Sequence, residues 1–216
     1  QMFNSQEIAG HLKLFRAFFE NHLTRNDPPP YAPAFQWIAQ PDQGYSEVWV
    51  CGWDRPRLLE RIAGAFLAAQ INILSADIFT RGDNLAVDTF RVCLTGMEPV
   101  TDLRDIARVE TRLIDSLAVE DFDFAPLLGK DSRLRTWRIS QEADLPAQIT
   151  IDNSSHPIYT IVDVRAPDRL GLLYDLLRAF GAAGVNIEIS RITTEMEFAL
   201  DSFYITARDG RKVEDE

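Results

Sequence analysis

The residues best suited to bind a ligand form a short turn, Asp168-Arg169-Leu170-Gly171-Leu172, between a predicted strand and a predicted helix. The first turn of a helix offers unpaired N–H groups and the positive end of the helix dipole, which suit the α-carboxylate of an amino acid. Gly171 would let a ligand approach the backbone because it has no Cβ, and Asp168 could accept hydrogen bonds from a ligand ammonium group. This turn is therefore a candidate amino-acid site.

Asn186, followed by Ile187, lies where the chain returns from that helix into the next strand. Its side-chain amide offers donors and an acceptor that could pair with amide-like groups of a ligand. A purely structural explanation also exists, with Asp168 as the helix N-cap, Gly171 as a close helix-to-strand contact and Asn186 as a turn residue. The sequence alone leaves both interpretations open.

Groups that could carry out catalysis are few. Asp121 and Asp123 have the spacing that holds Mg²⁺ in nucleotidyl transfer, but no Gly-Ser phosphate-binding turn precedes them, so an acidic loop is the ordinary explanation. His11 and His22 would lie about 16 Å apart on a helix, too far to share a metal ion. No nucleophile elbow, P-loop, CxxC or HExxH motif occurs. We expect neither catalytic residues nor a metal site in this chain.

Residues 46–96 and 157–210 are two copies of one unit, related by an offset of 114 positions that falls to 113 after a hairpin. A repeat with a single gap in a loop indicates a duplicated domain. An aspartate recurs at matching strand positions, as Asp88 and Asp201. We expect both aspartates to anchor the neighbouring loop rather than to take part in catalysis.

The first copy repeats the candidate turn with one difference, because Arg57 stands where the second copy has Gly171. A long cation at this position would crowd or fill a pocket. We therefore expect the second copy to bind a ligand and the first to hold a weaker or degenerate site. The members of that second site would be Asp54, Arg55, Arg57, Asn72 and Ile73.

Hydrophobic periodicity predicts the order strand, helix, strand, strand, helix, strand for the first copy, which is typical of a ferredoxin-like α+β fold with an antiparallel sheet. The strands are expected at 47–52, 72–80, 85–94 and 147–152, and the helices at 56–66 and 101–117. The second copy repeats only the first half, with elements at 159–165, 170–183, 186–194 and 199–208.

An amphipathic helix over Ser5–Thr24 and a proline-bearing connector precede the first copy. We therefore divide the chain into residues 1–45 from an upstream domain, a first domain at 46–152 and an incomplete second domain at 153–216. A bare sheet face would be an aggregation liability, so the helix Ser5–Thr24 or a partner subunit is expected to cover the second copy. The start at Gln1 favours a piece of a longer protein.

Composition limits the partners of the chain. Its 216 residues carry a net charge of −11, which would repel phosphate backbones and anionic lipid, so nucleic acid and membrane surfaces are not expected partners. The two cysteines, Cys51 and Cys93, lie in strand-like apolar runs. This placement favours buried thiols in a reducing cytoplasm over a disulfide.

Both copies resemble ACT domains, which are small amino-acid-sensing modules. The likeness is carried by the two turns and their flanking elements, at 50–73 and 162–187. The second copy and the helix around His11 are similar to the C-terminal region of the PII uridylyltransferase/uridylyl-removing family. The resemblance runs from about Ile8 to Lys212, with little of it in 118–145.

The resemblance implies a regulatory fragment that senses glutamine, without a cofactor of its own. Catalysis, its Mg²⁺ and the PII protein would then belong to upstream domains, and paired sheet edges would allow a homodimer. The ligand residues carried over are Asp168, Arg169, Gly171 and Leu172, with Asn186 and Ile187 opposite.

Other classes of function stay open. The two copies could regulate a different enzyme, or they could form an amino-acid-binding repeat protein with no enzyme attached. A third possibility is nucleotide transfer through Asp121 and Asp123, which would require Mg²⁺-dependent nucleotide binding.

Overall fold

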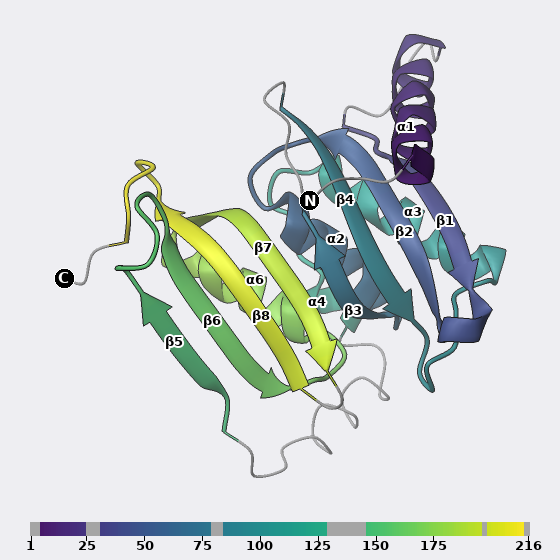
Figure 1. Ribbon diagram of the computed structural model, residues 1–216. Helices are drawn as coiled ribbons and strands as arrows, with labels where there is room; N and C mark the ends of the chain where they lie inside the picture. Colours follow the sequence, from purple (N-terminus) through teal and green to yellow (C-terminus); the bar gives the residue numbers. More distant parts are fainter. Residues whose placement is uncertain (1–4, 25–30, 79–83, 129–145, 196–197, 214–216) are drawn as a thin grey trace.

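The computed structural model describes residues 5–24, 31–78, 84–128, 146–195 and 198–213 (Figure 1). Eight strands form one antiparallel sheet in the order β1-β2-β4-β3-β7-β8-β6-β5. The strands are β1 (Ala34–Gln40), β2 (Tyr45–Trp53), β3 (Asn72–Asp77), β4 (Leu85–Cys93), β5 (Gln148–Asp152), β6 (Thr160–Pro167), β7 (Val185–Glu195) and β8 (Phe198–Ala207). The helices are α1 (Ser5–Thr24), α2 (Leu58–Ala68), α3 (Leu103–Leu117), α4 (Ala125–Leu128) and α6 (Leu172–Ala183), with a 3-10 turn at Pro41–Gln43.

The two copies meet edge to edge through β3 and β7. Ser75 pairs with Thr193, Ala76 with Ile192, and Asp77 with Arg191. Asp77 and Arg191 are 114 positions apart and so occupy the same place in each copy. An antiparallel pair of equivalent strands relates the copies by an approximate two-fold axis at this point, as in an isologous dimer interface.

The outer strand of each copy comes before the rest of the copy, which corrects the expected order. β5 pairs with β6, so the strand expected at 147–152 belongs beside the second copy and not the first. The first copy takes its outer strand from β1, inside the stretch expected to be a connector. Phe35 on β1 and Ile149 on β5 are 114 positions apart, so the duplication extends to these strands. Sequence reasoning missed this because the two outer strands share apolar character and not residue identities.

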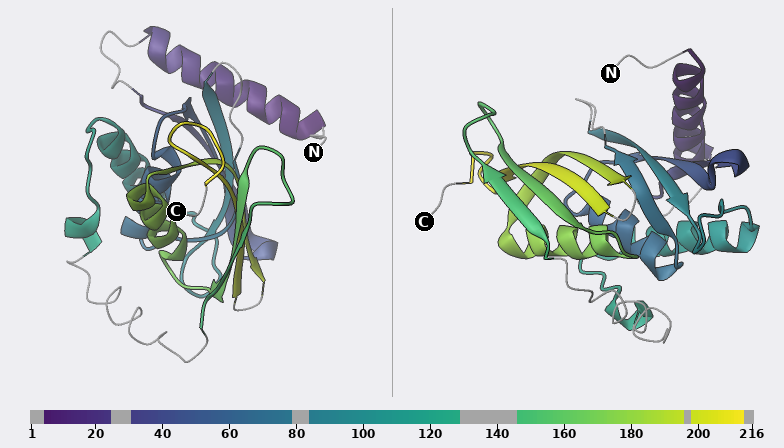
Figure 2. Two further views of the ribbon diagram at one scale, coloured as in Figure 1. Left: turned by 90° about the vertical axis from the view of Figure 1, so that its left-hand side faces the viewer. Right: turned by 60° about the horizontal axis from the view of Figure 1, so that its bottom comes forward.

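The described helices cover both faces of the first copy and one face of the second (Figure 2). α2, α3 and α6 lie on one face, where Val48 and Val50 of β2 belong to the main core. The alternate residues Trp49 and Cys51 point to the other face, where they pack under α1. This alternation follows from the two-residue period of a strand.

The predicted helix Ser5–Thr24 is confirmed as α1, but its expected place over the second copy is wrong. Leu14 and Phe18 of α1 are buried against the first copy, where they form an apolar cluster with Trp49 and Cys51 of β2. In the second copy, Ile149 and Ile151 of β5 remain 62% and 64% exposed. None of the described helices is long and apolar enough to cross a membrane.

Candidate functional site

A cavity lies at the seam between the copies, with an empty volume of about 370 Å³ that includes space open to solvent. The first copy supplies the end of α2 and the start of β3, and the second supplies the turn before α6 together with parts of β7 and β8. Most of the lining is apolar, and a few polar groups converge on it, as in small-molecule sites generally. The lining residues are Ala63, Leu67, Ile71, Asn72, Ile73, Asp168, Arg169, Gly171, Leu172, Leu173, Tyr174, Ile192, Thr194, Ala199 and Asp201.

Gly171 forms the N-cap of α6 and has a left-handed backbone with φ of 82°. A Cβ at this position would lie 2.8 Å from Leu67 Cδ2, so a larger residue would force the Leu67 side chain to shift, and the left-handed backbone also favours glycine. The expected close approach is thus present, but the neighbour is a helix of the other copy. The alternative in which Asp168 caps this helix is wrong. The N-cap residue is Gly171, and the N-cap position makes no side-chain hydrogen bond to the helix.

Asp168 reaches across the seam to the first copy. Its Oδ2 accepts a hydrogen bond from Asn72 Nδ2 at 3.2 Å. Burial raises the pKa of the Asp168 carboxyl, and the hydrogen bond from Asn72 opposes this rise. Asn72 and Ile73 therefore lie opposite the turn. Asn186 and Ile187 do not line the cavity, and Asn186 Nδ2 donates instead to the Ala207 carbonyl at 3.4 Å.

Arg169 lines the cavity and carries a guanidinium group. Its Nη2 forms an ion pair with Asp175 Oδ2 at 2.7 Å. Its Nη1 is buried and has no hydrogen-bond partner in the part of the chain that the structure describes. A buried guanidinium donor without a partner is costly, and a carboxylate is the group that satisfies it best.

Asp201 on β8 is a cavity residue that sequence reasoning did not select for binding. It is 2% exposed, and its Oδ1 accepts a hydrogen bond from the Thr193 backbone N–H at 3.3 Å. Burial and, to a smaller extent, the charge of Asp168 raise the pKa of Asp201 to about 7. The recurrence of this aspartate in both copies was the available signal, and it was interpreted as an anchor for the neighbouring segment.

A comparison with protein families identifies the fold of the second copy. A family model described as "ACR9-like, ACT-like domain" matches residues 148–216, which contain the second copy from its outer strand onward. The second copy is an ACT-like domain. The first copy has the same strand order and the same helix after its second strand, so the chain has a tandem ACT-like fold.

The chain is also similar to one segment of much longer bacterial enzymes. It is 31% identical over 180 residues to the bifunctional uridylyltransferase/uridylyl-removing enzyme of Rhodospirillum rubrum, which covers 83% of this chain and 19% of that enzyme. It is 32% identical over 175 residues to the enzyme of the same name from Erythrobacter litoralis, which covers 81% and 19%. The chain thus spans about a fifth of the length of these relatives.

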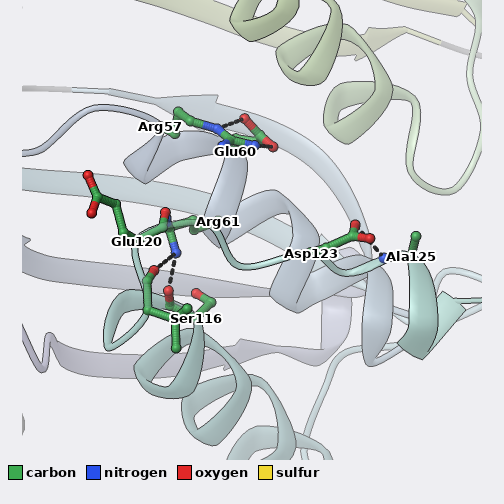
Figure 3. A network of polar contacts seen from close by, with 8 residues as sticks. Arg57, Glu60, Arg61, Ser116, Glu120, Asp123 and Ala125 are labelled. Atoms are coloured by element: carbon green, nitrogen blue, oxygen red, sulfur yellow. Dashed lines mark hydrogen bonds and ion pairs between the residues drawn. The ribbon is translucent and has the colours of Figure 1, made fainter.

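The turn of the first ACT-like copy is closed by its own side chains (Figure 3). Arg57 is the N-cap of α2 with φ of 66°, and its Nε and Nη2 both donate to the Glu60 carboxylate at 2.8 Å. The hydrogen bond to Glu60 raises the pKa of Arg57. Glu60 stands where the second copy has Tyr174. An ion pair therefore occupies the place of the open turn.

The neighbouring arginines of this copy serve the end of α3. Arg55 Nη1 donates to the Leu117 carbonyl at 2.7 Å, and Arg61 donates to the carbonyls of Ser116, Val119 and Glu120 (Figure 3). Carbonyl groups at and after the end of a helix lack hydrogen-bond partners within the helix. The two arginines supply donors to these carbonyls, and their positive charge lies favourably at the negative end of the helix dipole. Asp54 and Arg55 do not line the cavity, whereas Asn72 and Ile73, expected for the first copy's own site, do.

Asp123 has a local structural role. Its Oδ1 accepts a hydrogen bond from the Ala125 backbone N–H at 2.9 Å, at the start of α4 (Figure 3). Within the described ranges, no group of three or more histidine, cysteine, aspartate or glutamate side chains could hold a metal ion. The hydrogen bond of Asp123 to the start of α4 is a local structural role of the kind expected for an acidic loop.

Proposed function

We propose that this chain is a regulatory module that senses an amino acid, most specifically glutamine, for a uridylyltransferase/uridylyl-removing enzyme. The observation that carries the proposal is the seam cavity, which is lined by Asp168, by Asp201 and by Arg169, whose guanidinium group has a buried donor without a partner among the described residues. A free donor and excess acceptors in one small cavity are complementary to the carboxylate and ammonium groups of an amino acid.

Each group of the ligand has a complement in the cavity. The α-carboxylate would bind Arg169 Nη1 and the N–H groups at the start of α6, and the ammonium group would bind Asp168. The side-chain amide of glutamine would pair with Asn72, which comes from the other copy. Because both copies contribute walls, a ligand would favour one arrangement of the pair, and attached domains would respond to that arrangement as a population shift.

The similarity to the two bacterial enzymes favours this parent over a different regulated enzyme or a stand-alone repeat protein. Uridylyl transfer and removal, with Mg²⁺ and PII as the protein substrate, would then belong to domains outside this chain. We place the module in the cytoplasm. The outer strands β1 and β5 leave sheet edges through which two chains could pair.

The test is calorimetric titration of the chain with glutamine, glutamate, asparagine and the branched-chain amino acids. We expect selective glutamine binding in the wild type and a loss of at least about 100-fold in Gly171→Arg, because the new side chain would meet Leu67 in the cavity. Gly210→Arg is the matched control. It introduces the same residue at a φ of 80° where a Cβ meets nothing within 4 Å, so it should bind as the wild type does.

Two results would count against the proposal. If the wild type binds none of these amino acids, the cavity is not a sensor site in this chain. If glutamine binds equally well to Gly171→Arg, the site lies elsewhere. Selective binding of a different amino acid would keep the sensor and change its ligand.

A further inference from the structure

The seam cavity contains two carboxyl groups, and the second of them has spare capacity to bind a ligand. Asp201 is 2% exposed and lies on β8, while Asp168 enters from the turn before α6. Among the described residues, the hydrogen bond from the Thr193 N–H is the only one made to Asp201, and at 3.3 Å it is longer than a typical N–H···O bond. A carboxylate can accept about four hydrogen bonds, so most of its capacity is unused.

The charged groups around Asp201 leave an excess of negative charge. The turn contributes Asp168 and Arg169, and Arg169 is already paired with Asp175 of α6. Tyr174 of α6 lines the same cavity, and the Cys93 thiol of β4 is near Asp168. α2, β3 and β7 contribute only uncharged lining residues. Two buried acids close together cannot both ionise easily, unless a cation joins them.

We propose that Asp201, together with Asp168, binds the ammonium group of the ligand, and that the ligand replaces a proton held by this pair of acids. The proposal rests on the amino-acid-sensing function. The ligand ammonium group keeps its three protons and donates them to the carboxylates. The proton of Asp201 leaves to bulk water, and the ammonium group supplies one positive charge to the two carboxylates in its place.

The competing explanation is that Asp201 only anchors β7 through Thr193. Asp88 of the first copy provides the comparison, because it occupies the matching strand position, is also 2% exposed and does not line the cavity. An anchor would have the same effect in both copies. A ligand-binding acid would have its effect only at Asp201.

The expected size of the effect follows from the pKa of Asp201, which burial raises to about 7. At pH 7 about half of a proton should be released for each ligand bound, rising toward one proton at pH 6 and falling toward zero above pH 8. The affinity should accordingly increase about tenfold between pH 6 and pH 8, because only the ionised carboxylate binds the ammonium group.

The experiment is calorimetric titration of the 216-residue chain with L-glutamine at pH 6, 7 and 8, in two buffers that differ in ionisation enthalpy. Wild type, Asp201→Asn and Asp88→Asn would be compared. Asp201→Asn keeps an oxygen for the Thr193 N–H and has no proton to lose. We expect its proton release to vanish and its affinity to become independent of pH, while Asp88→Asn keeps the wild-type proton release.

A second measurement does not depend on the variants. The carboxyl carbon of Asp201 can be titrated by NMR in the wild type with and without glutamine, and its midpoint should fall from near 7 by at least about one unit when ligand is bound.

The outcomes separate the two proposals. Glutamine binding without proton release, with Asp201→Asn indistinguishable from wild type, would make Asp201 an anchor and overturn this inference while leaving the sensor function intact. Absence of amino-acid binding in the wild type would overturn both.

Discussion

The outer face of the sheet is apolar in the first copy and polar in the second, although the two copies share one strand order. Trp49 and Cys51 of β2 lie under α1, and the residues 114 positions later are Asp163 and Arg165 of β6, both exposed. Asp163 accepts a hydrogen bond from Ser202 instead of packing under a helix. Because alternate residues of a strand face opposite sides, each face can be changed without disturbing the core on the other.

The copies also differ at the turn before their first helix. In the first copy Arg57 pairs with Glu60 and closes the turn, while in the second Gly171 leaves it open toward Leu67. The closed copy still contributes to the cavity through Leu67 and Asn72. The two copies therefore differ in what they contribute: the first copy packs under α1 and forms one wall of the cavity, and the second supplies the open turn.

The largest loss of stability is expected when a residue on the outer face of the first copy is replaced by its counterpart from the second copy. Trp49 is 5% exposed, and its ring packs edge-to-face against the ring of His11 with the ring centroids 4.9 Å apart. Trp49→Asp should lower the free energy of unfolding by about 4 kcal/mol or more, through lost packing and a buried unpaired charge. Asp163→Trp, the reverse change on an exposed strand position, should alter it by less than about 1 kcal/mol.

Urea unfolding followed by circular dichroism would measure both variants, and protease cleavage near α1 would show whether that helix is released. Similar losses in the two variants would mean that the second copy's outer face is also covered in solution.

Local sequence patterns predicted most of the helices and strands because these patterns act within an element, although β1 was expected to be part of a connector. The period of the apolar residues predicted α1, and the repeat of Asp54-Arg55 as Asp168-Arg169 located the turn. Side-by-side pairing of the copies was expected, within the chain or across a dimer, but the strands that pair could not be predicted, because the choice of β3 and β7 depends on surfaces that exist only after each copy folds. Asn186 was therefore expected where Asn72 lies. The cavity that distinguishes Asp201 from the equally buried Asp88 arises from the same assembly.

A smaller difference is expected between the outer strands. Trp37 of β1 donates through Nε1 to Glu110 of α3 at 3.0 Å and packs against Phe66, while Ile151, at the matching position of β5, is 64% exposed. Trp37→Ala should cost about 3 kcal/mol of unfolding free energy, and Ile151→Ala less than about 0.5 kcal/mol. Urea titrations at two protein concentrations would measure this. A large, concentration-dependent loss in Ile151→Ala would show that a second chain covers that strand.

The smallest effect is expected from opening the first copy's turn with Arg57→Gly. Glycine relieves a left-handed backbone at φ of 66°, worth about 1 kcal/mol, but the substitution also removes the two hydrogen bonds to Glu60. These contributions have opposite signs, so the stability measured by urea unfolding should change by less than about 1 kcal/mol. Arg57→Gly/Glu60→Gln, which also removes the buried charge left behind, should be at least as stable as the single variant.

Arg57→Gly also tests whether this one residue prevents the first copy from binding a ligand of its own. Calorimetry should still give one glutamine for each chain, because Glu60 keeps a carboxylate where the second copy has Tyr174, and because Arg55 and Arg61 remain engaged with the end of α3. A second bound glutamine would mean that one arginine alone separates the two copies. One bound ligand would mean that the first copy has become a wall of the site through several coupled side chains, which a single glycine cannot reverse.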